Sequence, residues 1–171
     1  VLVNNAGLVH ESVVITGDPA ASIIELAQIH ACDLIVMGTR ALGALRSAIE
    51  AAVREEALAQ VEARESSLVA WAAGEGWHPG VVGIVAARVK EATGLPAVVI
   101  GVEGGIGKGS ARSVPGVDLG RAVQRLAAEG LLLKGGGHAM AAGLTVEAAK
   151  IPAAMARLSE LLAREMAARS G

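Results

Sequence analysis

Three consecutive glycines, Gly135, Gly136 and Gly137, stand between Lys134 and His138. Glycine has no side chain to bar close approach and tolerates positive φ, so these amides can converge on an anion that Lys134 and His138 then contact. The chemistry that this pattern favours is a phosphate grip. The alternative is a flexible glycine turn between two strands.

A second segment, residues 107–113, reads GKGSARS and is strand-like. Its Lys108, Ser110 and Arg112 alternate with small residues and therefore project from one face of a strand, with Ser113 following. Lysine, hydroxyl and guanidinium groups side by side suit a phosphodiester, since arginine offers forked donors and lysine a mobile charge. The alternative is an exposed sheet face with ordinary surface charge.

A third segment begins with Trp77 and His78, which are followed by Pro79 and Gly80 and then by the apolar residues 81–87. This stretch is long enough for a helix, and its first turn would leave free amide groups near His78. Trp77 and His78 are therefore added to the candidate binding residues.

In this order and spacing the three segments resemble the DHH-associated domain of RecJ-type exonucleases, specifically the bacterial form. These enzymes act on single strands in the 5′ to 3′ direction. The resemblance rests on EGWHPGVVGIVAARVKE from residue 75, GKGSARSVPGVDLG from residue 107 and LLLKGGGHAMAAGLTVE from residue 131. It extends back through a helix from about Ser47 that is similar to the family's connector helix. The resemblance implies a domain that holds the nucleic-acid strand while a separate DHH domain carries the metals and cuts.

Two-metal hydrolysis needs carboxylates and imidazoles that converge on paired cations. The aspartates are Asp18, Asp33 and Asp118, and the histidines are His10, His30, His78 and His138, with no Asp-His-His run. Asp18 and Asp118 stand where helix N-caps belong. We therefore expect a binding module with no catalytic residues, metal site or cofactor of its own, which does not hydrolyse DNA alone. Manganese or magnesium would belong to the separate DHH catalytic domain.

Residues 9–46 resemble something else, the closing half of a universal stress protein, an α/β fold that binds ATP in many members. Residues 13–19, the amphipathic stretch after them and residues 33–40 read as strand, capped helix and strand. The family's nucleotide motif is incomplete here, because Ala41 replaces its second glycine and Ala51 and Ala52 replace its final pair. Binding of ATP or another nucleotide is nevertheless the alternative function, and it belongs to a different class from nucleic-acid binding.

Residues 1–7 resemble the Asn-Asn-Ala-Gly strand end of short-chain dehydrogenases. That family needs a catalytic tyrosine, and this chain has none. Three unrelated resemblances in a chain that begins with valine lead to the hypothesis of a recombined, designed or fragmentary sequence, which could fold and yet bind nothing tightly.

Composition sets the outer limits of these interpretations. Of the 171 residues, 53% are hydrophobic, which is ample for a core. The single Cys32 fits a reducing cytoplasm, and no apolar stretch has the length that spans a bilayer, so we expect a cytoplasmic protein with no membrane partner. The net charge of −2 divides into −5 over residues 1–66 and +3 over residues 67–171, so the RecJ-like part is mildly basic.

The chain is thus expected to be an α/β protein of three parts: a βαβ unit over residues 1–46, a connector helix over 47–66 and a mixed-sheet DHH-associated domain over 67–171. Within the last part we expect strands at 68–72, 97–102, 107–113 and 143–146, and helices at 80–93, 118–130 and from Pro152 onward. Ser66 and Ser67 should break the connector helix. The expected function is to grip the phosphate backbone of single-stranded DNA or a short oligonucleotide without reading its sequence.

Overall fold

The structure, a computed structural model, describes residues 39–64 and 68–169. The chain divides into two compact units, residues 1–51 and 52–171. Helix α2 (Thr39–Glu62) begins in the first unit and ends in the second. The predicted βαβ unit, the Asp18 cap and the break at Ser66 and Ser67 lie outside the described residues. Thr39 and Arg40, expected at the end of a strand, instead form the first turn of α2.

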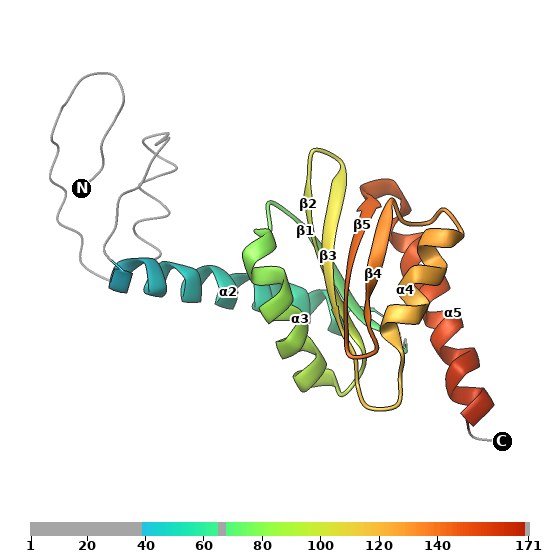
Figure 1. Cartoon of the computed structure of the whole chain (residues 1–171). Helices are drawn as coiled ribbons and strands as arrows, with labels where there is room; N and C mark the ends of the chain where they lie inside the picture. Colours follow the sequence, from blue (N-terminus) through green and yellow to red (C-terminus); the bar gives the residue numbers. More distant parts are fainter. Residues whose placement is uncertain (1–38, 65–67, 170–171) are drawn as a thin grey trace, which may run out of the picture. The chain divides into compact units, whose positions relative to one another are not determined.

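The second unit is built on a five-stranded mixed sheet (Figure 1). Its strands lie in the order β1 (Ala70–Glu75), β2 (Ala97–Glu103), β3 (Ile106–Arg112), β5 (Ala141–Glu147) and β4 (Lys134–His138). β1 and β2 are parallel, and every other neighbouring pair is antiparallel. The predicted α/β class and mixed sheet are confirmed. β2 is apolar along nearly its whole length because both faces of this strand are covered.

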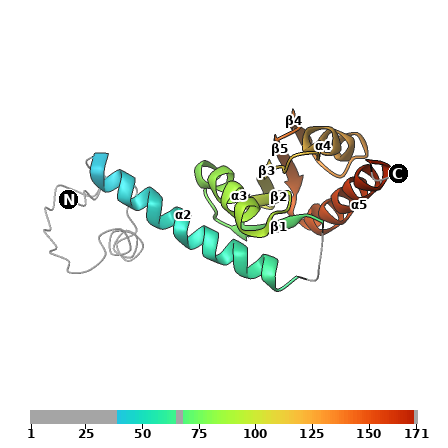
Figure 2. The ribbon, with the colours of Figure 1, turned by 90° about the horizontal axis from the view of Figure 1, so that it is seen from below.

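Helices cover the two faces of the sheet (Figure 2). Helix α3 (Pro79–Thr93) provides the crossover between β1 and β2 and packs on β2 and β3. Helices α4 (Leu119–Ala128) and α5 (Ile151–Arg169) lie on the opposite face, and the short 3-10 helix η1 (Ala148–Lys150) precedes α5. The largest core cluster joins the sheet to α4 and α5 and includes Val98, Ile100, Leu126, Leu144, Val146, Met155, Leu158 and Leu162.

Local signals in the sequence explain where α3 and α4 begin and end. His78 caps α3 by accepting a hydrogen bond at Nδ1 from the Gly80 amide, and Pro79 occupies the first turn. α3 ends at Gly94, whose φ of 68° is a left-handed conformation that favours glycine. The predicted cap Asp118 is confirmed, since its carboxylate accepts from the Arg121 amide at 3.0 Å.

The C-terminal half of α2 lies against β1, which is an edge strand. The Gln60 side-chain amide donates to the Ala73 carbonyl at 2.9 Å and accepts from the Ala73 amide at 3.1 Å, so it replaces a neighbouring strand at this point. Arg64 donates to the Trp71 carbonyl and lies 3.7 Å from the centroid of the Trp71 ring. These contacts fix the end of α2 to the sheet.

Two predicted boundaries differ from the structure. The strand expected at residues 68–72 is β1, which begins at Ala70 and runs to Glu75. The glycine run, for which no strand was predicted, is β4, because residues 134–138 pair with β5 along their whole length. Among the described residues, no helix combines the length and apolar character that crossing a membrane requires.

Helices α4 and α5 are joined by the carboxylate of Glu129. It accepts hydrogen bonds from Arg125 Nε at 2.8 Å and from Arg157 Nε and Nη2 at 2.9 and 3.0 Å. The donors on Arg157, and then those on Arg125, lower the pKa of Glu129 from its usual 4.5 to about 2.

We expect this carboxylate to stabilise the fold in a pH-dependent way. Because the folded pKa lies below the unfolded one, its stabilising contribution is complete above pH 4.5 and is lost as the pH falls toward 2. Glu129→Gln should therefore lower the Tm at neutral pH, and the difference from the native chain should shrink over that acidic window. Thermal unfolding followed by circular dichroism measures this. A Tm difference that does not change with pH would contradict the assignment.

Candidate functional site

The strand register brings most of the predicted binding residues onto one face of the sheet. Cross-strand partners point to the same side of a sheet, and three such rows cross β3, β5 and β4. They are Lys108, Thr145 and Lys134; Ser110, Gly143 and Gly136; and Arg112, Ala141 and His138. We refer to these nine residues as the three-row face.

The three-row face lies on the α3 side of the sheet. A Cβ placed on Gly83 of α3 would lie 3.1 Å from Arg112 Nη2 and 3.3 Å from Ser110 Oγ. α3 packs mainly on β2 and β3, and the part of this face that β5 and β4 form holds a hollow. Gly143 is exposed, and no atom lies within 4 Å of a Cβ built on Gly136. A ligand can therefore approach the backbone here closely.

A shallow hollow of about 470 Å³ occupies this open part. Lys108 and Lys134 line it from two strands, with Thr145 between them in the same row. Its floor is formed by Gly136 and Gly143. The hollow therefore combines two ammonium groups and a hydroxyl with a floor that has no side chains, and an extended anion can fit against these groups.

Arg112 is held at the α3 side of the three-row face. Its Nη1 donates to the Ala111 carbonyl at 2.9 Å, and its side chain is half-buried beside Gly83. Glycine at position 83 allows this arrangement, because any larger side chain would push the guanidinium away. The group is thus oriented before a ligand arrives, which reduces the entropic cost of binding.

The cations of the three-row face have no internal counter-ions. Within residues 39–64 and 68–169, no carboxylate forms an ion pair with Lys108, Arg112 or Lys134. Elsewhere in the domain Arg125, Lys150 and Arg157 are each paired with a glutamate. The positive potential of the three-row face therefore remains available to an external anion.

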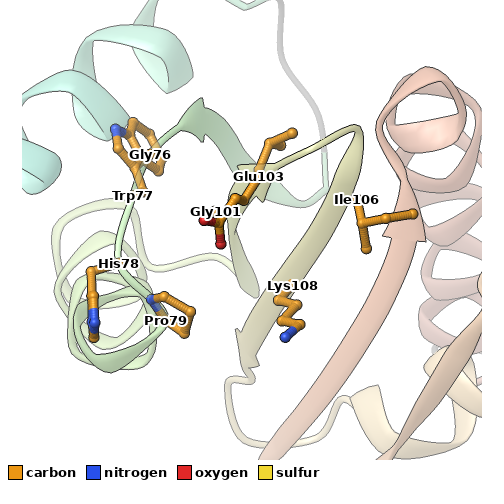
Figure 3. Close-up of a pocket in the computed structure, with 9 residues that line it drawn as sticks. Gly76, Trp77, His78, Pro79, Gly101, Glu103, Ile106 and Lys108 are labelled. Carbon is orange, nitrogen blue, oxygen red and sulfur yellow. The ribbon is translucent and has the colours of Figure 1, made fainter.

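A second hollow, of about 400 Å³, adjoins the first through Lys108, which lines both. Figure 3 shows Lys108 on the strand side of this hollow and His78 and Pro79 on the helix side. His78 is exposed at the N-terminus of α3, where amide groups and the helix dipole favour a negative charge. The two hollows extend the surface available to an anionic chain from β4 to α3.

The two candidate histidines make the same kind of local bond. His78 Nδ1 accepts from the Gly80 amide at 3.0 Å, and His138 Nδ1 accepts from the Met140 amide at 3.3 Å. An imidazole that accepts at Nδ1 carries its proton on Nε2 when neutral. Both rings are exposed, so each Nε2 proton is available as a donor to a phosphate oxygen.

The structure changes the role of the glycine run. β4 is extended, so successive peptide groups point in opposite directions and the three amides cannot converge on one anion. A Cβ on Gly135 would lie 2.7 Å from Val123 Cγ1, and one on Gly137 would overlap the Ala141 carbonyl oxygen. These two glycines serve close packing inside the domain, and only Gly136 faces the open side.

Two further predicted residues are placed away from the open surface. Ser113 is 1% exposed, and its hydroxyl donates to the Val117 carbonyl at 2.8 Å, which stabilises a turn. Trp77 is 7% exposed, and its Nε1 donates to Glu56 Oε2 at 3.0 Å. The Ser113 hydroxyl is thus used inside the domain, and the Trp77 side chain lines the second hollow with only a small part of its surface. Trp77 instead fixes the loop that leads to His78.

Sequence reasoning missed three residues of this site. Thr145 and Gly143 alternate along β5 and would follow from the register, but the sequence does not show which strands pair. Gly83 carries no signal beyond being a small residue inside a helix.

Among the described residues, no group of three or more histidine, cysteine, aspartate or glutamate side chains is arranged to hold a metal ion.

The fold and motifs agree with known families. The model of the DHHA1 domain matches residues 64–164, and that of the universal stress protein family matches residues 2–62. The chain belongs to the DHHA1 domain family. The predicted resemblance to the RecJ form of this domain is confirmed by the relatives described next.

Single-stranded-DNA-specific exonucleases RecJ are similar to this chain. The Bacillus subtilis protein is 44% identical over 88 residues, 50% of this chain and 11% of the relative. The Escherichia coli protein is 40% identical over 130 residues, 71% of this chain and 22% of the relative. The chain thus spans about a fifth or less of the length of these relatives.

Solved RecJ structures share this fold. An exonuclease RecJ bound to manganese superposes with a TM-score of 0.60 and 33% identity, over 84% of this chain and 32% of that one. RecJ from Thermus thermophilus in complex with Mn²⁺ gives a TM-score of 0.60 and 31% identity, over 86% of this chain and 23% of that one. The α/β architecture described above is therefore that of a RecJ-like DHHA1 domain.

Proposed function

We propose that this chain binds single-stranded DNA through its phosphate backbone, as the accessory domain of a RecJ-type exonuclease. The observation that carries the proposal is the three-row face, on which Lys108, Arg112 and Lys134 lie together and form no ion pair with any residue of the described ranges. The relatives' specificity for single-stranded DNA supports it. The strand would lie across the Gly136 and Gly143 floor, with Ser110, Thr145, His78 and His138 as further hydrogen-bond donors.

The grip would not depend on base sequence. Phosphate contacts position a strand without reading it, whereas base recognition needs stacking platforms or edge contacts. Both tryptophans are engaged inside the domain, Trp71 beneath Arg64 and Trp77 with Glu56. We further propose that cleavage requires a separate DHH catalytic domain, which would hold manganese or magnesium.

Arg112→Ala should weaken binding of a labelled single-stranded oligonucleotide by about 1–3 kcal/mol, because it removes a charge-assisted contact to phosphate. Fluorescence polarisation measures the affinity, and circular dichroism checks that the fold is unchanged. Arg88→Ala is the matched control, because Arg88 is an exposed arginine on α3 that pairs with Glu91. Native affinity in a folded Arg112→Ala protein would make this residue ordinary surface charge.

An alternative function rests on the match of residues 2–62 to the universal stress protein family. In that case the chain would bind ATP or another nucleotide through its N-terminal part. Competition separates the two functions. Oligonucleotide binding that ATP does not displace supports the first, whereas saturable ATP binding without oligonucleotide affinity supports the second.

A further inference from the structure

A hollow with a different lining lies between α4 and α5, on the side of the sheet opposite the three-row face. It encloses about 300 Å³ and is lined by Arg121, Ala122, Arg125, Leu161 and Arg164. We call it the arginine groove. None of the proposed DNA-binding residues lines it, so it calls for a separate explanation.

Three guanidinium groups surround the arginine groove. Arg121 and Arg125 are one turn apart on α4, and Arg164 comes from α5. Arg125 Nε donates to Glu129, whereas Arg121 and Arg164 form no ion pair with any residue that the structure describes. Like charges one helical turn apart repel each other. An anion between them would relieve this repulsion and use their unfilled donors.

The wall of the arginine groove is apolar. Ala122 is 6% exposed, and Leu161 is half-buried against the main core. The described lining offers no hydroxyl, amide or aromatic group that could bind a sugar or stack on a base. A matching ligand must therefore present carboxylates or phosphates together with an aliphatic group.

We propose that the arginine groove docks an acidic segment of another protein, which presents carboxylate and aliphatic side chains on the same face. Carboxylates match the forked donors of Arg121 and Arg164, and an aliphatic side chain between them would cover Leu161. A nucleic-acid strand offers the anions but few aliphatic groups for this wall, so charge and apolar character together favour a peptide. The inference does not depend on the function of the three-row face.

The test uses the full chain and a fluorescein-labelled peptide of repeated Glu-Glu-Leu-Leu, which when extended carries both side chains on each face. We expect saturable binding in fluorescence polarisation, and Arg121→Gln combined with Arg164→Gln should weaken it by at least about tenfold. The control variant Lys150→Gln, which removes a cation that pairs with Glu147, should bind normally. A peptide of repeated Glu-Glu-Ser-Ser should bind more weakly than the leucine peptide, and circular dichroism should show all variants folded.

Oligonucleotide binding by the double arginine variant distinguishes this site from the three-row face. Unchanged oligonucleotide affinity together with lost peptide affinity supports the inference. The inference is overturned if the native chain does not bind the peptide, or if the double variant binds it with native affinity. It is also overturned if the double variant loses oligonucleotide affinity, because the groove would then belong to the path of the nucleic acid.

Discussion

Replacing Lys108, Arg112 and Lys134 together by alanine is expected to weaken binding of a single-stranded oligonucleotide by at least about 100-fold. Each substitution removes a charge-assisted contact worth about 1–3 kcal/mol, so even the low end of the three sums to about 3 kcal/mol. Lys108 and Lys134 are exposed, Arg112 is half-buried, and none of the three belongs to the core, so the fold should be retained. Fluorescence polarisation gives the affinity.

The matched control removes the same net charge from the opposite side of the sheet. Arg125, Lys150 and Arg164 belong to α4, η1 and α5, and their combined replacement by alanine should leave oligonucleotide affinity nearly unchanged. An equal loss in both triple variants would mean that net charge, and not the three-row face, determines binding.

Gly101→Ala is expected to destabilise the domain by about 3 kcal/mol, since overpacking against rigid backbone cannot be relieved by a side-chain rotation. A Cβ at this position of β2 would overlap the carbonyl oxygen of Trp77. That part of the chain is fixed on both sides, because the Gly76 amide donates to Val102 and the Trp77 indole donates to Glu56. The loop would have to move, and His78 with it.

Urea denaturation measures this difference, and Gly136→Ala is the control. No atom lies within 4 Å of a Cβ at Gly136, so the same chemical change should alter stability by no more than about 0.5 kcal/mol. Equal stability of the Gly101→Ala and native proteins would show that the loop does not rest rigidly on β2.

The sequence predicted well those features that depend on local periodicity. The alternation from Lys108 to Arg112 places three polar groups on one side of a strand, and β3 confirms this. Asp118 and Gly94 were predicted as helix ends from chemistry that acts within one turn, and both are confirmed. Val53 and Ala57, which are one helical turn apart on α2, are both buried.

Features set by distant contacts could not be predicted. Glycine disfavours strands, so residues 134–138 read as a loop. Pairing with β5 and the packing of Gly135 on Val123 override that preference. Trp77 was predicted as a binding residue, yet Gly74 and Gly101 leave room for it against the sheet. The pairing of β4 with β5, which brings Lys134 into the row of Lys108, depends on residues far apart in the chain.

The dependence of oligonucleotide affinity on salt tests the central claim most directly. Cations that neutralise phosphates release counterions, so the logarithm of the binding constant should fall linearly with the logarithm of the salt concentration. If Lys108, Arg112 and Lys134 each neutralise one phosphate of a single strand, the slope for the native chain should be about −2. A fluorescence-polarisation titration of the 171-residue chain at several salt concentrations gives this slope. An affinity that does not change with salt would contradict a grip on the phosphate backbone.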